Sequence, residues 1–423
     1  MSGSAIIDDL EARGLLHDST DLDALRTRLD DRPITVYAGF DPSADSLHAG
    51  NLVPLLLLRR FQEAGHRPIV LAGGATGMIG DPSGRSDERN LLDDATLDHN
   101  LASIIPQLEQ LLDFTPGPLQ AQQVDNRTWT APVPMLEFLR DVGKHVTVNQ
   151  MLAKESVKAR VAGEGGISYT EFSYMLLQAN DYWWLHTNED CELQVGGSDQ
   201  WGNITAGIDL IRRREGRHVH GLSVPLLLRS DGVKFGKTAE GAVWLSPEKT
   251  SPYAFYQYWF NTVDADVETF LLRMTLVPVD EIHEVARAHG AAPEKREGQR
   301  RLAWEMTALV HGITAADEAA KASQGFTASV ASASEADLAA LADEIPTTHV
   351  TRTQLPLELV DLLVSAGLEP SKSAARRQID GGGVSVNDVK VPAARALEVS
   401  DLLHERYILV RRGKRQRHLI VVS

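Results

Sequence analysis

The chain has 423 residues, 43% of them apolar and 24% charged, which is enough to bury the cores of two or three domains. Its net charge of −16 excludes a protein that binds nucleic acid over its whole surface. The single cysteine, Cys191, excludes an internal disulfide, and with no secretory signal at the acidic N-terminus it favours a reducing, cytoplasmic location.

The first half of the chain predicts alternating strands and helices. Residues 34–40 and 67–72 are typical of buried strands, with a helix expected at 49–64 between them. Helices are also expected at 170–185 and 201–214, and a short strand at 225–228. This alternation predicts an α/β fold with a doubly wound parallel sheet, Rossmann-like, over residues 1–250. No apolar run is long enough to cross a membrane, so no membrane partner is expected.

The second half predicts three further regions. Residues 251–324 show a helical pattern and are expected to form a helical domain. Residues 325–353 are rich in small and polar types and predict a linker with one helix at 335–343. Residues 354–423 predict a small α+β domain, with helices at 357–366 and 371–380 and strands at 384–387, 407–410 and 418–422.

The charge is distributed unevenly between these regions. Residues 351–423 contain 12 Lys and Arg against 8 Asp and Glu, a balance of +4, whereas the remainder carries −20. A basic module on an acidic chain suggests that this end alone contacts a polyanion. An ordinary basic surface would show the same bias.

Three segments carry candidate chemistry. Residues 47–51 (Leu-His-Ala-Gly-Asn) start a helix after a strand, where unpaired N–H groups favour an anion. Residues 234–238 (Lys-Phe-Gly-Lys-Thr) offer two ammonium groups and a hydroxyl for a polyphosphate. Residues 73–85 are laced with glycine but contain neither a dinucleotide fingerprint nor a P-loop. Each segment alone also fits an ordinary turn or capped helix.

Together, the first two segments resemble the HIGH and KMSKS signatures of class I aminoacyl-tRNA synthetases. Residues 37–42, 80–84, 172–178 and 196–203 narrow the resemblance to the bacterial tyrosyl-tRNA synthetases, over essentially the whole chain. The sequence has Asn51 where the signature has a second histidine, and Arg85 where many relatives have lysine. The resemblance implies ATP as a substrate, accompanied by Mg²⁺ without a dedicated protein metal site.

The resemblance also implies roles for individual residues. Tyr37 and Asp181 would read the phenol hydroxyl of tyrosine, and Asp181 shares one helix face with two further predicted ligands, Tyr174 and Gln178. The full set expected to bind tyrosine is Tyr37, Asp81, Tyr174, Gln178, Asp181, Gln194 and Gln200. The set expected to bind ATP is Gly39, Asp41, His48, Asn51, Gly197, Asp199, Lys234 and Lys237. The set expected to act in catalysis is His48, Asn51, Lys234, Lys237 and Thr238.

The remaining implications concern macromolecular partners. Residues 354–423 resemble the S4-type RNA-binding domain, which implies tRNA(Tyr) as a partner. The residues expected to contact it are Lys372, Arg376, Arg377, Arg411, Arg412 and Lys414. Residues 125–182 resemble the dimer-forming insertion of the family, which implies a homodimer.

Three alternatives remain open at this point. A tryptophanyl-type synthetase has the same fold and chemistry, although Asp181 with Tyr37 suits a hydroxyl group better. A non-catalytic RNA-binding or splicing factor built on a synthetase fold is disfavoured by intact His48, Lys234 and Lys237. A small-molecule adenylate-forming ligase is disfavoured by the basic C-terminal module.

Overall fold

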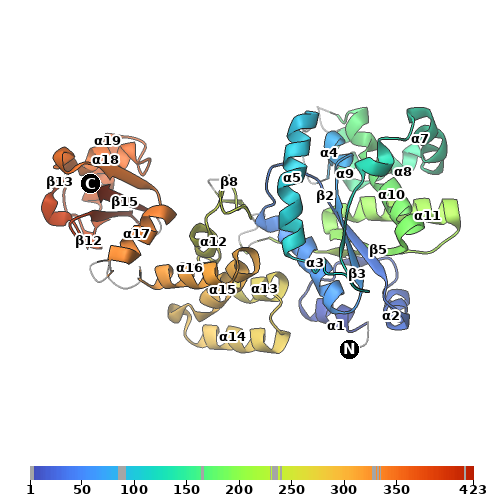
Figure 1. Cartoon of the computed structure of the whole chain (residues 1–423), viewed down its shortest axis with the longest axis horizontal. Helices are drawn as coiled ribbons and strands as arrows, with labels where there is room; N and C mark the ends of the chain where they lie inside the picture. Colours follow the sequence, from blue (N-terminus) through green and yellow to red (C-terminus); the bar gives the residue numbers. More distant parts are fainter. Residues whose placement is uncertain are drawn as a thin grey trace. The chain divides into compact units, whose positions relative to one another are not determined.

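The computed structural model describes residues 4–83, 92–162, 166–228, 230, 237–238, 241–325, 330, 333, 335–413 and 416–423. The chain divides into two compact units (Figure 1). Unit 1 comprises Met1–Thr250 with Thr262–Leu302, and unit 2 comprises Ser251–Asn261 with Ala303–Ser423. None of the helices in these described ranges is long and apolar enough to span a membrane.

Unit 1 is built on a six-stranded sheet whose strand order is β1-β6-β5-β2-β3-β4. Its strands are β1 (Asp18–Ser19), β2 (Thr35–Phe40), β3 (Arg67–Ala72), β4 (Gln122–Asp125), β5 (Cys191–Gly197) and β6 (His220–Val224). All pairs are parallel except β1 with β6. The chain order reverses between β2 and β5, which confirms the doubly wound sheet. At such a reversal the connections leave in opposite directions and open a crevice at the carboxyl ends of the strands.

The central strands β2 and β3 are almost entirely buried because helices cover both faces of the sheet. In Figure 1, α3 and α5 lie on one side of the sheet, and α10 and α11 lie on the other. The helices up to α11 are α1 (Ala5–Ala12), α2 (Leu22–Asp31), α3 (Leu52–Glu63), α4 (Thr76–Ile79), α5 (Asp94–Gln110), α6 (Arg127–Thr130), α7 (Met135–Asp141), α8 (Val148–Leu152), α9 (Glu155–Ala162), α10 (Tyr169–Glu189) and α11 (Trp201–Glu215). The strands and helices expected at 34–40, 49–64, 67–72, 170–185 and 201–214 are confirmed within a few residues.

The strand predicted at 225–228 was wrong. Strand β6 ends at Val224, and Pro225, which has no N–H to donate to a sheet, begins the connection that follows. The apolar run from Pro225 to Leu228 is explained instead by a cavity, because three of its residues line one.

The segment predicted as a helical domain, 251–324, consists of helices but is divided between the two units. Helices α13 (Asp264–Met274) and α14 (Val279–Ala291) belong to unit 1, whereas α12 (Pro252–Phe260) and α16 (Ile313–Gly325) belong to unit 2. Helix α15 (Glu297–His311) is counted in both because the division falls after Leu302.

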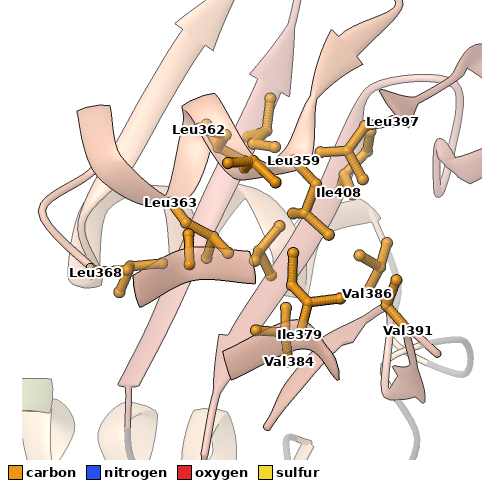
Figure 2. Close-up of a cluster of buried hydrophobic side chains, with 14 of the residues drawn as sticks. Leu359, Leu362, Leu363, Leu368, Ile379, Val384, Val386, Val391, Leu397 and Ile408 are labelled. Carbon is orange, nitrogen blue, oxygen red and sulfur yellow. The ribbon is translucent and has the colours of Figure 1, made fainter. Parts of the chain in front are cut away.

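The C-terminal domain, residues 347–423, has a five-stranded sheet of order β12-β11-β14-β15-β9. Its strands are β9 (Thr347–Val350), β11 (Val384–Val386), β12 (Val389–Lys390), β14 (Tyr407–Arg412) and β15 (Gln416–Val422); β10 (Leu357–Glu358) and β13 (Ala396–Leu397) pair separately. Helices α18 (Leu359–Ser365) and α19 (Lys372–Asp380) complete it. Figure 2 shows their leucines and isoleucine meeting the valines of the sheet in one closed apolar core.

The linker predicted at 325–353 was wrong at its end. Its helix is confirmed as α17 (Glu335–Glu344), but Thr347–Val350 forms β9 and pairs in parallel with β15. The run Thr-Thr-His-Val is only four residues long, although its threonines and valine favour a strand. It becomes a strand because β15 offers an unpaired edge.

Candidate functional site

A cavity of about 720 Å³ opens where β2 and β5 end, at the reversal of strand order in unit 1. Every described side chain that the sequence assigned to tyrosine or ATP lines it. These residues are Tyr37, Gly39, Asp41, His48, Asn51, Asp81, Tyr174, Gln178, Asp181, Gln194, Gly197, Asp199 and Gln200. Residues up to 163 positions apart, Tyr37 and Gln200, therefore meet in one place because parallel strands end at one edge.

Three polar side-chain atoms in the cavity are buried without a hydrogen-bond partner in the described part of the chain. They are the hydroxyl of Tyr37, Oε1 of Gln178 and Oε1 of Gln194. An unpaired buried polar atom costs about 1–3 kcal/mol, so a folded protein rarely keeps three together unless a ligand completes them. One donor-acceptor hydroxyl and two amide oxygens suit a ligand with hydroxyl or ammonium groups.

Asp181, on α10, is held by two residues that the sequence analysis missed. Nδ2 of Asn126 donates to its Oδ2 at 2.9 Å, and Nε1 of Trp129 donates to its Oδ1 at 2.9 Å. Burial raises the pKa of Asp181 to about 7, although these two hydrogen bonds lower it and the charges of Asp41 and Asp125 raise it further. The position of Asn126 could have predicted this contact, because it directly follows β4 at the carboxyl edge of the sheet.

Tyr37 lies next to this carboxylate in the same buried region. Its side chain is 1% exposed, and its ring lies 5.2 Å from the ring of Tyr182. Burial raises the pKa of Tyr37 well above its ordinary value, and the charge of Asp181 raises it further. The Tyr37 hydroxyl therefore stays protonated and can donate to a ligand oxygen while Asp181 accepts from it.

A second pair of carboxylates lies nearer the strand ends. Asp41 accepts from the hydroxyls of Tyr174 at 2.9 Å and Thr76 at 2.7 Å. Asp81 accepts from Nε2 of Gln200 at 2.7 Å, which ties two predicted tyrosine ligands to each other. The cavity is therefore rich in oriented carboxylates, an environment suited to an ammonium group.

The glycine pair after β3 makes room for two carboxylates, Asp41 and Asp125. A Cβ on Gly73 would lie 2.1 Å from Oδ1 of Asp41, and one on Gly74 would lie 2.2 Å from Oδ1 of Asp125. Both positions thus require glycine for close approach.

The residues of the first signature, His48 and Asn51, lie directly before the N-terminus of α3. Nδ1 of His48 accepts from the N–H of Gly50 at 3.1 Å, and Oδ1 of Asn51 accepts from the N–H of His48 at 3.0 Å. A neutral imidazole whose Nδ1 accepts carries its proton on Nε2, so His48 offers a donor there. The amide nitrogen of Asn51 is likewise the donating end of its side chain, as expected for a group that contacts an anion.

The second signature segment is only partly described. Lys234 lies outside the described residues, and for Lys237 and Thr238 the backbone forms β7 (Lys237–Thr238), which pairs with β8 (Gly241–Ala242). The chain then passes directly beside the helix mouth, because Trp244 forms a β-bridge with His48. The chain that follows the second signature is therefore in backbone contact with the first signature.

The residues predicted to contact tRNA lie in the C-terminal domain and differ in their pairing. Arg376 and Arg377 are exposed on α19, with no carboxylate partner among the described residues. Lys372 pairs with Asp361 at 2.7 Å, Arg411 with Asp388, and Arg412 with the buried Glu369. Lys414 lies outside the described residues.

The chain is similar to known proteins over nearly its whole length. Residues 29–328 match the family described as tRNA synthetases class I (W and Y), and residues 337–420 match the Tyrosine--tRNA ligase SYY-like C-terminal domain. It is 54% identical over 415 residues to the Tyrosine--tRNA ligase of Opitutus terrae, covering 97% of this chain and 98% of that one. It is 52% identical to that of Mycobacterium tuberculosis H37Rv, covering 98% of each.

Solved structures agree with this assignment. A C-terminally truncated mitochondrial tyrosyl-tRNA synthetase from Aspergillus nidulans matches with a TM-score of 0.69 and 31% identity, over 76% of this chain and 94% of that one. A tryptophanyl-tRNA synthetase from Encephalitozoon cuniculi matches with a TM-score of 0.55 at 15% identity, which shows the shared fold alone. The chain belongs to the class I tRNA synthetase family of the W and Y type and, within it, to the tyrosine–tRNA ligases.

Proposed function

We propose that this chain is a tyrosine–tRNA ligase that joins L-tyrosine to ATP as tyrosyl-adenylate, releases pyrophosphate, and then transfers the tyrosyl group to the 3′ end of tRNA(Tyr). The observation that carries the proposal is the cavity in which the unpaired hydroxyl of Tyr37 lies beside the buried carboxylate of Asp181. This pair complements a phenol group, which both donates and accepts a hydrogen bond.

The other cavity residues suit the rest of the amino acid. Tyr174, Gln178 and Asp81 bind the α-ammonium group, and Gln200, held on Asp81, lies near the carboxylate. Gln194 supports the pocket wall. Binding in this orientation directs the tyrosine carboxylate toward the helix mouth.

ATP binds at the open end of the same cavity. Gly39 and Asp41 contact the nucleotide after β2, and Gly197 and Asp199 contact its ribose after β5. The phosphates lie at the mouth of α3, where His48 and Asn51 donate hydrogen bonds. Mg²⁺ arrives with the triphosphate, whose oxygens supply its ligands.

The reaction needs no covalent enzyme intermediate. The tyrosine carboxylate, already ionised, attacks the α-phosphorus, and the bond to the pyrophosphate oxygen breaks. The protein contributes alignment of the two reactants and stabilisation of charge on the departing pyrophosphate. His48, Asn51, Lys234, Lys237 and Thr238 supply that stabilisation.

Amino-acid-dependent ATP–pyrophosphate exchange tests this function directly. We expect exchange with tyrosine and far less with tryptophan or phenylalanine assayed in parallel. Exchange driven best by tryptophan would identify the tryptophanyl activity, and its absence with all three would favour a non-catalytic protein. Charging of tRNA(Tyr) with labelled tyrosine then tests the second step.

The exposed surface of residues 125–182 supports a homodimer. It displays apolar side chains that a monomer leaves in water, among them Met135 and Leu136, which are 72% and 75% exposed. Others are Val133, Leu139, Val148, Leu152, Val161 and Tyr169. Light scattering should give twice the chain mass, and Leu136→Glu should shift it toward the monomer.

The C-terminal domain is the tRNA-binding part of this scheme. Its exposed Arg376 and Arg377 suit contacts with phosphates. A cytoplasmic location follows from the tRNA substrate and agrees with a buried, unpaired Cys191.

A further inference from the structure

The carboxylate of Asp266 holds the residue that precedes the lysine-bearing segment. Asp266 lies in the first turn of α13 and is only 6% exposed. Its Oδ1 and Oδ2 accept from the backbone N–H of Ser230 at 3.0 and 3.2 Å. Ser230 stands four residues before Lys234. Hydrogen bonds to an ionised carboxylate are about twice as strong as neutral ones. The contact with Asp266 therefore fixes the backbone at Ser230.

The other end of α13 is fixed to the first helices of the chain. Arg60, on α3, donates from Nη2 to the carbonyl of Thr275, just after α13 ends. Arg13 donates to the carbonyls of Leu272 at 3.1 Å and Val277 at 2.8 Å. Both guanidinium groups are nearly buried, with 4% of the side chain exposed. They donate to carbonyls in the last turn of α13 and in the residues directly after it.

Helix α3 is the helix whose mouth carries His48 and Asn51. Helix α13 therefore runs from a contact with α3 at one end to the attachment of Ser230 at the other. On the far side of the lysine-bearing segment, the carbonyl of Val243 accepts from the N–H of Ala49 at 2.8 Å, and the N–H of Leu245 donates to Leu47 at 2.8 Å. Ser230 is thus held by α13, and Val243 and Leu245 are held by the residues just before α3.

Asp266 could instead serve only to stabilise its own helix. An acidic residue in a first turn stabilises its own helix through the dipole. Asp264 shares that turn but directs its carboxylate to Gln299 at 2.6 Å and His289 at 3.2 Å, away from Ser230. The two aspartates therefore separate helix stabilisation from attachment of the segment.

We propose that Asp266 is a positioning residue for adenylate formation, which acts by fixing Ser230 so that Lys234 and Lys237 meet the phosphates of ATP. The inference rests on the proposed function. It assigns Asp266 no contact with substrate.

The first test measures ATP–pyrophosphate exchange by Asp266→Ala and Asp266→Asn in the full chain. Because misplacing a catalytic group by about 1 Å can cost a hundredfold, we expect Asp266→Ala to lower the exchange rate by about tenfold or more. The KM for tyrosine should change by less than about twofold. Asp266→Asn keeps one acceptor oxygen and should restore most of the rate. Asp264→Ala is the matched control and should leave the rate near that of wild type.

The second test asks whether Asp266 acts through the lysines. In a Lys234→Ala background, Asp266→Ala should lower the rate by much less than it does alone, because coupled residues are non-additive. Full additivity of the two losses would overturn the proposal. So would an Asp264→Ala loss as large as that of Asp266→Ala.

A third measurement does not depend on activity. Hydrogen–deuterium exchange of peptides that include Ser230 should speed up in Asp266→Ala and not in Asp264→Ala, because only the former frees that N–H. Unchanged exchange there would overturn the attachment even in an inactive protein. If the wild-type chain instead showed no tyrosine-dependent ATP–pyrophosphate exchange, the proposed function would be overturned. The two failures are therefore distinguishable.

Discussion

The cavity of unit 1 and the C-terminal domain differ in where the polar groups suited to a ligand lie. In the cavity, three buried polar atoms of Tyr37, Gln178 and Gln194 have no partner within the described chain. In the C-terminal domain, Arg411 and Arg412 are paired with carboxylates, whereas Arg376 and Arg377 are exposed to solvent around a closed apolar core. The cavity therefore suits small molecules whose polar groups pair with buried side chains, and the domain presents exposed charges suited to a large polyanion.

This difference sets how each region should respond to change. Recognition by buried, unpaired groups depends on the hydroxyl of the ligand and on the protonation of Asp181, and only weakly on salt. Recognition by exposed arginines depends on ionic strength, because binding to phosphates releases counterions. The following experiments test that division, beginning with the largest expected effect.

Removing a lysine of residues 234–238 should separate catalysis from binding within unit 1. Lys234→Ala and Lys237→Ala should each lower the rate of adenylate formation by on the order of a hundredfold, as for a lost donor to a developing charge. Tyrosine affinity, measured by equilibrium dialysis, should stay near wild type. Lys295→Ala, an exposed lysine elsewhere in unit 1, is the control. Rates within about twofold of wild type in both variants would refute the role of these lysines.

Acidification should weaken tyrosine binding through Asp181. The ionised carboxylate accepts from the phenol, so affinity is complete above the pKa of about 7. Below it, affinity should fall by up to about tenfold per pH unit. Isothermal titration from pH 5.5 to 8.5 measures this, and Asp181→Asn should bind weakly with no such slope.

The raised pKa of Asp181 makes the stability of the ligand-free protein fall as pH rises, whereas the affinity for tyrosine increases. The folded state keeps a proton that the unfolded chain releases, so the contribution of Asp181 is complete below the ordinary carboxyl pKa of 3.8 and is lost as pH rises to about 7. Asp181→Asn should remove this part of the pH dependence of Tm. If the affinity of the wild-type protein for tyrosine does not change between about pH 5.5 and 8.5, Asp181 does not titrate in the cavity.

Deleting one hydroxyl should reduce the preference for tyrosine over phenylalanine. Tyr37→Phe removes the hydroxyl that pairs with the phenol of bound tyrosine. When free phenylalanine binds instead, that same hydroxyl would have no partner. We therefore expect the preference in exchange assays to fall by about tenfold, near 1.4 kcal/mol. Tyr182→Phe is a matched control, since its hydroxyl donates to the carbonyl of His220 at 2.7 Å, and it should leave the preference unchanged.

The smallest effect on substrate binding is expected from a single exposed arginine of the C-terminal domain. Arg377→Ala should weaken tRNA binding and lower the slope of log affinity against log salt by about 1. Arg412→Ala should instead destabilise the domain by on the order of 2 kcal/mol, because it leaves the buried carboxylate of Glu369 without its partner. Filter binding over a salt series and thermal melts distinguish these outcomes. A salt slope unchanged in Arg377→Ala would remove that residue from the interface.

Local pattern in the sequence determined much of this protein. The apolar runs at 34–40 and 67–72 and the helix between them predicted the parallel sheet, and the spacing of Tyr174, Gln178 and Asp181 put them on one helix face. Such features depend on residues a few positions apart, whose geometry is set by the backbone alone. The signatures at 47–51 and 234–238 identified the chemistry by resemblance to a family.

Only the tertiary structure decided which distant residues meet. Asn126 and Trp129 reach Asp181 from more than 50 positions away, and Asp266 reaches Ser230 from 36. Strand β9 exists because β15 offers it an edge, and Arg412 is paired because Glu369 is buried beside it. No periodicity records these contacts, because chain packing brings the partners together after the local elements have formed.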